Sequence, residues 1–148
     1  MRKQLAAPVV ALVVALTLTA VATGSTHKTK MNFTAVLNVG QEVPHPIGTK
    51  VGAAGKFTVS VSGTTLTWKL TFTHLSGPAT AAHIHHEKKG KAGAVIVPLC
   101  GPCTSGASGT ATVTSAEITL MKSGATYVNV HTAKNPNGEI RGQIHMVM

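Results

Sequence analysis

Three histidines in two separate segments have a spacing that could support metal binding. His83 and His85 flank Ile84, so in a β-strand both imidazoles lie on one side and Ile84 faces the other. The segment Tyr127–His131 alternates polar with apolar residues, which places His131 on a polar face. If the two strands are neighbours, three neutral imidazoles converge, and copper, zinc and nickel accept such ligands. The spacing predicts a metal site of His83, His85 and His131 with an open position, while the alternative is that these imidazoles hydrogen-bond to loops.

Cys100 and Cys103 are the two cysteines of the chain, and their C-x-x-C spacing is that of thiol–disulfide oxidoreductases. In those enzymes the first cysteine begins a helix, which lowers the pKa of its thiol. Here a strand-like run precedes Cys100, and the Gly- and Ser-rich segment 104–109 follows Cys103. We therefore expect a local disulfide that fixes a turn between strands, with redox catalysis and metal ligation as the alternatives.

The N-terminus has the properties of a secretory signal. Arg2 and Lys3 precede an apolar run from Leu5 to Val21, which ends in the small-residue sequence Ala20-Val21-Ala22. This predicts a signal peptide over 1–22, a linker over 23–31 and one domain over 32–148. A retained membrane anchor is the alternative, although the run is short for a span of about 20 residues. We expect a secreted, periplasmic or extracellular protein that meets the membrane only through its transient signal segment.

The composition limits the classes of active site and of binding partner that the protein can have. The 148 residues include 13 Lys and Arg but only 4 acidic residues, for a formal charge of +9, and all four acids are Glu. The lack of Asp excludes paired-aspartate catalysis, Asp-rich calcium loops and Asp-oriented triads. The basic balance favours an unknown extracellular partner or an anionic surface polymer. Nucleic acid is not favoured, because the one basic cluster, Lys88–Lys91, has no interleaved aromatic residues.

After the linker, the chain falls into short runs with the two-residue period of half-buried strands. The clearest is Leu66–Phe72, which places Trp68 on the core side. Similar alternation occurs in three other segments, Phe33–Val39, Phe57–Val61 and Ile140–Met146. No segment has a convincing helical period. The pattern predicts an all-β, immunoglobulin-like Greek-key β-sandwich of about seven or eight antiparallel strands.

The last of these strands places two charged residues, Glu139 and Arg141, on the face opposite Ile140. We expect this face to point outward. Arg141 is then either exposed to solvent, or it pairs with a cross-strand carboxylate or braces a loop carbonyl.

Several segments, in order along the chain, resemble the CHRD domain family, which is named for its occurrence in chordin. They are Phe33–Leu37, Gln41–Pro44, Ala82–His85, Val95–Cys100, Tyr127–Thr132 and Asn135–Ile144. Together they span nearly the whole chain after the signal. The resemblance implies a secreted, immunoglobulin-like β-sandwich. No general catalytic activity attaches to the family, so it implies a non-catalytic binding module.

The histidine pattern is also similar to the copper ligands of copper/zinc superoxide dismutases, which are Greek-key sandwiches too. Both have His-x-His on one strand, a Val-His strand far downstream and an Arg near the C-terminus. The similarity implies copper on His83, His85 and His131, and an Arg141 that attracts an anionic substrate. With no Asp for a zinc site, it implies a copper-only, superoxide-dismutase-like redox enzyme as the alternative function.

Overall fold

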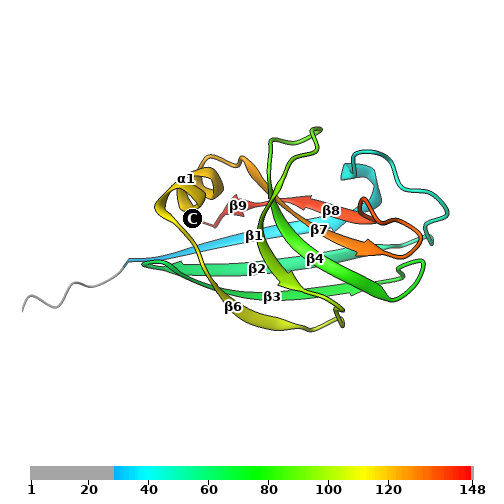
Figure 1. Ribbon diagram of the computed structural model, residues 1–148, viewed down its shortest axis with the longest axis horizontal. Helices are drawn as coiled ribbons and strands as arrows, with labels where there is room; N and C mark the ends of the chain where they lie inside the picture. The colour runs from blue at the N-terminus through cyan, green and yellow to red at the C-terminus, as the bar shows by residue number, and fades with distance from the viewer. Residues whose placement is uncertain (1–28, 148) are drawn as a thin grey trace, which may run out of the picture.

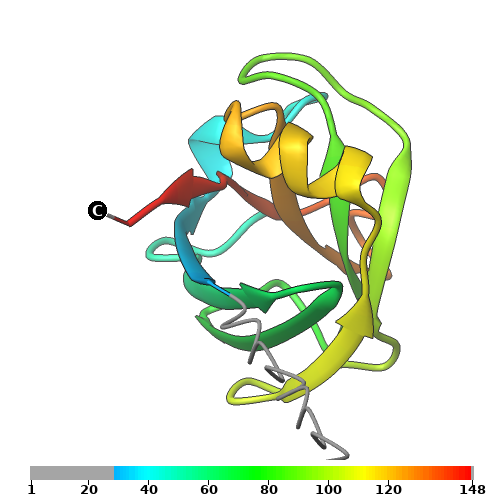
Figure 2. The same ribbon diagram turned by 90° about the vertical axis from the view of Figure 1, so that its left-hand side faces the viewer.

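The computed structural model of the protein describes residues 29–147, which form an antiparallel β-structure with one short helix (Figure 1). The strands are β1 (Lys30–Asn38), β2 (Ala54–Ser62), β3 (Thr65–Thr73), β4 (Ala79–His86), β5 (Val95–Cys100), β6 (Ser108–Thr112), β7 (Thr126–Thr132), β8 (Ile140–Gln143) and β9 (His145–Met146). They form one sheet in the order β5-β4-β7-β8-β1-β2-β3-β6, and β9 pairs with β1. The sheet curls until β5 approaches β6 (Figure 2). The predicted all-β Greek-key sandwich is confirmed, as one continuous sheet that nearly closes into a barrel.

The two-residue periods place the apolar side chains in the core as predicted. β2 and β3 form a tight hairpin around Gly63, whose φ of 60° is a backbone conformation that glycine adopts without strain. Leu66, Trp68 and Leu70 of β3 are 0%, 5% and 0% exposed. The corresponding core residues of β1 and β2 are Phe33, Ala35, Leu37, Phe57, Val59 and Val61. The core therefore lies inside the curled sheet.

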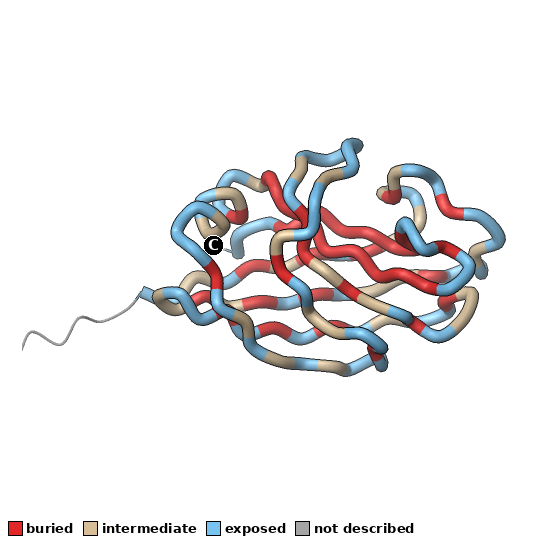
Figure 3. The backbone as a smooth tube through the Cα atoms, in the orientation of Figure 1, coloured by how far each residue is buried: buried red, intermediate tan, exposed pale blue. Residues whose placement is uncertain are grey.

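The outward face of β8 is not exposed, and this part of the prediction is wrong. Glu139 and Arg141 are 0% and 1% exposed, although Ile140 faces the core as expected. The reason is that loops cover the outer face of β7 and β8, whose residues are all buried (Figure 3). Alternation reveals which residues share a face, but it does not reveal what covers that face.

The helix α1 (Ser115–Lys122) lies between β6 and β7 and was not expected from the sequence. Met121 is its one buried residue, so the helix has no apolar stripe of the kind that gives a helical period. Its sequence marker is a capping box instead: the Thr114 hydroxyl accepts from the Glu117 backbone N–H, and the Glu117 carboxylate accepts from the Thr114 N–H.

The predicted signal peptide over 1–22 and most of the linker over 23–31 lie outside the described residues, and β1 already begins at Lys30. In the described part of the chain, no helix is long and apolar enough to cross a membrane.

Candidate metal centre

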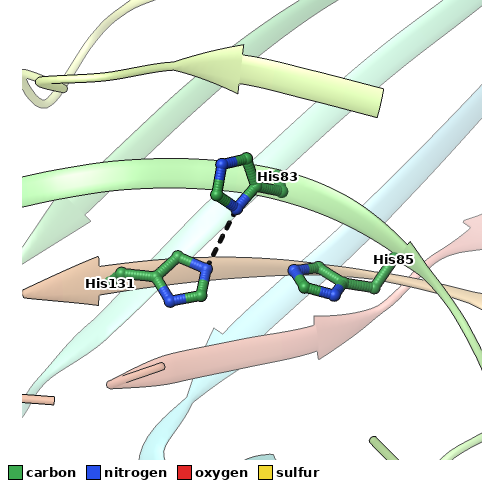
Figure 4. Close-up of side chains that lie close together, drawn as sticks. All are labelled: His83, His85 and His131. Carbon is green, nitrogen blue, oxygen red and sulfur yellow. Dashed lines mark hydrogen bonds between the residues drawn. The ribbon is translucent and has the colours of Figure 1, made fainter. Parts of the chain in front are cut away.

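β4 and β7 are antiparallel neighbours, and their register brings the three predicted ligands together. His83 pairs with Asn129 and His85 with Tyr127, while His131 lies opposite Ala81. The ligand nitrogens of the three histidines all lie within 4.8 Å of one another (Figure 4). Between residues 29 and 147, this is the one group of three or more histidine, cysteine or acidic side chains close enough to share a metal ion.

The spacing fits an ion after a small movement. Metal–imidazole bonds of about 2.0–2.1 Å place the nitrogens of two ligands about 3.3–3.6 Å apart. The Nδ1 of His83 is already 3.1 Å from the Nε2 of His131. The widest separation in the cluster, up to 4.8 Å, must therefore contract by about 1.2–1.5 Å, which side-chain rotation can supply.

Two of the three imidazoles are oriented by backbone carbonyls. The Nδ1 of His131 lies 2.9 Å from the carbonyl oxygen of Pro136, and the Nδ1 of His85 lies 2.9 Å from that of Gly93. A carbonyl oxygen only accepts, so each Nδ1 carries the proton and each Nε2 presents a lone pair. The Nε2 of His85 is buried and has no hydrogen-bond partner. This is how loops fix the tautomer of metal-ligating histidines in proteins.

The surroundings hold all three imidazoles in the neutral form. Burial lowers the pKa of His83, and the neighbouring His131 and His85 lower it further. Burial also lowers the pKa of His85, where the Gly93 carbonyl acts in the opposite direction and the charges of His131 and Arg141 add to the lowering. Burial lowers the pKa of His131 against the opposing hydrogen bond to the Pro136 carbonyl. A neutral imidazole is the form that binds metal.

Tyr127 links the site to the strand on the other side. Its ring stacks on that of His85, with centroids 4.8 Å apart and planes inclined by 11°. The Cζ atom of Arg141 lies 3.3 Å from the Tyr127 ring centroid. Because β7 lies between β4 and β8, the phenol ring separates the imidazole from the guanidinium. The Tyr127 hydroxyl also accepts a hydrogen bond of 3.1 Å from the Gly93 N–H, so the same ring supports the carbonyl that orients His85.

Arg141 holds the loop 87–94 in place through hydrogen bonds to its backbone. Its Nη1 donates to the carbonyl oxygen of Lys91 at 2.7 Å, and its Nη2 donates to that of Lys88 at 3.1 Å. Of the expected roles, the one in which Arg141 braces a loop carbonyl is confirmed, and solvent exposure is wrong. The guanidinium therefore contacts two loop carbonyls and one aromatic ring.

Sequence reasoning missed two glycines and a carboxyl group around the site. A Cβ on Gly93 would lie 1.6 Å from the His86 carbonyl oxygen, so the loop closes only with glycine there. Gly138 has a φ of 128°, and a Cβ on it would lie 2.3 Å from the Asn129 amide nitrogen. The Glu42 carboxylate accepts from the same nitrogen at 2.8 Å. Burial raises the pKa of Glu42 to about 7, against hydrogen bonds from Val43 and Asn129 and the charge of Arg141. Glu42 and Gly138 lie in segments that resemble the CHRD family, but the sequence does not reveal which loop meets which strand.

The cysteines are separate from the histidine cluster. Cys100 at the end of β5 and Cys103 form a disulfide, as expected, and the backbone of Cys103 donates to the Ala79 carbonyl at 3.1 Å. No helix begins at either cysteine. The pair closes the turn that leaves β5 and contributes no ligand to the imidazoles.

The fold and the site define a class of protein: a β-sandwich domain with a partly buried histidine cluster, in which loop carbonyls orient two of the three imidazoles. The CHRD domain family matches residues 33–144, which is most of the chain, and the protein belongs to that family. No curated protein and no solved structure gave a match. The resemblance to the family is confirmed, and membership supports a binding module without catalytic activity.

Proposed function

We propose that the protein is an exported, non-catalytic binding module that holds a transition-metal ion, copper in preference to zinc, on His83, His85 and His131. The observation that carries the proposal is the unpartnered, buried Nε2 of His85. A buried acceptor without a partner costs about 1–3 kcal/mol. A metal ion removes the cost, because it bonds to the same lone pair.

The donor set selects the class of ion. Three imidazole nitrogens suit copper, zinc and nickel, whereas magnesium and calcium require oxygen ligands. No carboxylate of the described residues belongs to the cluster. At a site of nitrogen ligands, divalent copper binds more tightly than zinc or nickel. Copper is therefore the ion to test first.

The test is a calorimetric titration of the folded protein with copper(II). His83→Ala, His85→Ala and His131→Ala should each weaken binding by more than about 100-fold. Each variant loses a residue that bonds the metal directly, and loss of a residue that only hydrogen-bonds to a ligand already costs about 10–100-fold in affinity. The matched control is His86→Ala, since His86 is exposed and adjacent to His85 but lies on the other face of β4. Equal affinity in all four variants, or wild-type binding no tighter than that of the urea-unfolded chain, contradicts the proposal.

One observation favours the redox alternative, a copper-only enzyme similar to superoxide dismutases. Three protein ligands leave a coordination position open, as catalytic metal sites do. Copper-loaded protein should then dismutate superoxide, and His131→Ala should abolish the activity. A copper-loaded protein with no activity above that of its metal-free form leaves the binding module as the function.

Export rests on the N-terminal segment, whose charge, apolar run and exit sequence are those of a secretory signal. N-terminal sequencing of the protein recovered from outside the cytoplasm tests it. A mature N-terminus after Ala22 supports export with cleavage, and an intact Met1 contradicts cleavage.

A further inference from the structure

Arg141 places a buried positive charge beside a site that has no anionic ligand. The residue is 1% exposed, and its Cζ atom lies over the Tyr127 ring, 3.3 Å from the ring centroid. The opposite side of this ring stacks on the imidazole of His85. The ligand set itself is three neutral nitrogens. A metal ion in this site is therefore near a buried cation and receives no negative charge from its three ligands.

We propose that the charge of Arg141 sets the oxidation state of the bound ion, so that the site binds copper(I) more tightly than copper(II). This inference rests on the proposed metal-binding function and deepens it. Arg141 is not a ligand on this proposal. It acts through its field on the ion that His83, His85 and His131 hold.

The physical argument compares two ionic charges at the same place. A fixed positive charge repels a doubly charged ion twice as strongly as a singly charged one, and the effective dielectric constant near a buried site makes the difference large. The stacked rings of Tyr127 and His85 occupy the space between the guanidinium and the metal, so water does not screen the interaction there. Three neutral imidazoles also satisfy copper(I), which accepts low coordination numbers, better than copper(II), which takes more ligands.

Two carboxyl groups oppose this field. The charge of Glu42 interacts with Arg141, and its carboxylate accepts from Asn129, which lies between His83 and Arg141 in the strand register. Glu87, at the start of the loop 87–94, also attracts Arg141. Glu42 is the buried one of the two, at 4% exposed. Its ionised form should reduce the preference for copper(I), and its removal should increase it.

The experiment measures the dissociation constants of both copper ions for matched variants. Copper(I) is titrated against a chromophoric chelator without oxygen, and copper(II) by calorimetry. Arg141→Met and Arg141→Lys both lose the forked hydrogen bonds to the loop carbonyls, but only Arg141→Met loses the charge. The ratio of the copper(II) constant to the copper(I) constant should fall by roughly tenfold in Arg141→Met and stay within about twofold of wild type in Arg141→Lys.

Glu42→Gln is an independent test that leaves Arg141 in place. At about pH 8, above the pKa of about 7 of this carboxyl, the variant removes a negative charge with little change in shape. The ratio should rise several-fold, whether or not the Arg141 variants fold.

Every outcome of these titrations either supports or overturns the proposal. Equal changes of the ratio in Arg141→Met and Arg141→Lys overturn the proposal and show that Arg141 only positions the loop. Tighter binding of copper(II) than of copper(I) by the wild type, or no change in Glu42→Gln, also overturns it. Failure of the proposed function looks different, because the wild type then binds neither ion.

Discussion

The Nδ1 of His83 donates a hydrogen bond to the Nε2 of His131, with 3.1 Å between the two nitrogens. The direction follows from the Pro136 carbonyl, which keeps the proton of His131 on Nδ1 and leaves its Nε2 able only to accept. A metal ion between the two rings needs a lone pair on the Nδ1 of His83 and another on the Nε2 of His131. His83 must therefore move its proton to its own Nε2 when the ion binds, while His85 and His131 already have the tautomer that binding requires.

This asymmetry predicts a tautomer change at one histidine. When zinc, which is diamagnetic, is added as a probe, the ¹⁵N shifts of the His83 ring should change from those of an Nδ1–H imidazole to those of an Nε2–H imidazole. The rings of His85 and His131 should keep Nδ1–H. A ring of His85 or His131 that has Nε2–H in the metal-free protein would contradict the assigned hydrogen bonds to Gly93 and Pro136.

The pH dependence of metal binding should begin lower than that of an ordinary histidine site. The pKa of each of the three histidines is lowered from the ordinary value of about 6.5, chiefly by burial, so protons compete with the metal only at lower pH. Titrations in steps of pH should place the midpoint of the loss of affinity below the ordinary histidine value of about 6.5. A midpoint at or above about 6.5 would contradict the lowered pKa values of the three imidazoles.

The same shifts predict the acid stability of the metal-free protein. The unfolded chain takes up protons on these histidines as the pH falls through 6.5, whereas the folded state does so only at lower pH. The free energy of unfolding should therefore fall between 6.5 and the lowered pKa values. Urea unfolding of the wild type and of a variant with all three histidines changed to Gln should show that this slope is lost in the variant.

Gly93→Ala should weaken metal binding as well as the fold. Its Cβ would lie 1.6 Å from the His86 carbonyl oxygen, so the loop must move and take with it the carbonyl that orients His85. We expect a loss of about 2 kcal/mol or more in unfolding free energy and a loss of roughly 10–100-fold in metal affinity. Gly77→Ala is the control, because a Cβ there meets no atom within 4 Å. Equal behaviour of the two variants would show that the loop does not position the ligand.

Arg141→Lys should be costly. A lysine cannot donate to the carbonyls of Lys88 and Lys91 in the forked geometry that Arg141 uses. Hydrogen bonds from a charged group are worth about 1.5–3 kcal/mol, so we expect a loss of about 2–3 kcal/mol in urea unfolding. The exposed Lys69 of β3 gives the comparison, since Lys69→Arg should stay within about 0.5 kcal/mol of wild type. A silent Arg141→Lys would mean that the guanidinium is solvated in solution.

The sequence was sufficient to predict which side chains of β4 and β7 share a face, because the two-residue period of a strand is a local pattern. A period of two residues places His83 with His85, and His131 with Tyr127, whatever the rest of the chain does. It was not sufficient for Arg141 or for Gly93. Their roles depend on loop carbonyls, which every residue type offers alike, and on which loop covers the outer face of the sheet. The helix α1 was not predicted, because it buries only Met121 and so has no helical period of apolar residues. Its one marker in the sequence is the capping box at Thr114.

The hydrogen-bonded ligands His83 and His131 are 48 residues apart in sequence, and β5, β6 and α1 lie between them in the chain. During synthesis, a growing chain that has reached only β5 offers the His-x-His pair and no third imidazole. The complete set of ligands appears only when β7 has been made and has docked on β4. On the proposed function, a metal ion added after synthesis therefore stabilises only those copies of the protein in which β7 has already docked on β4.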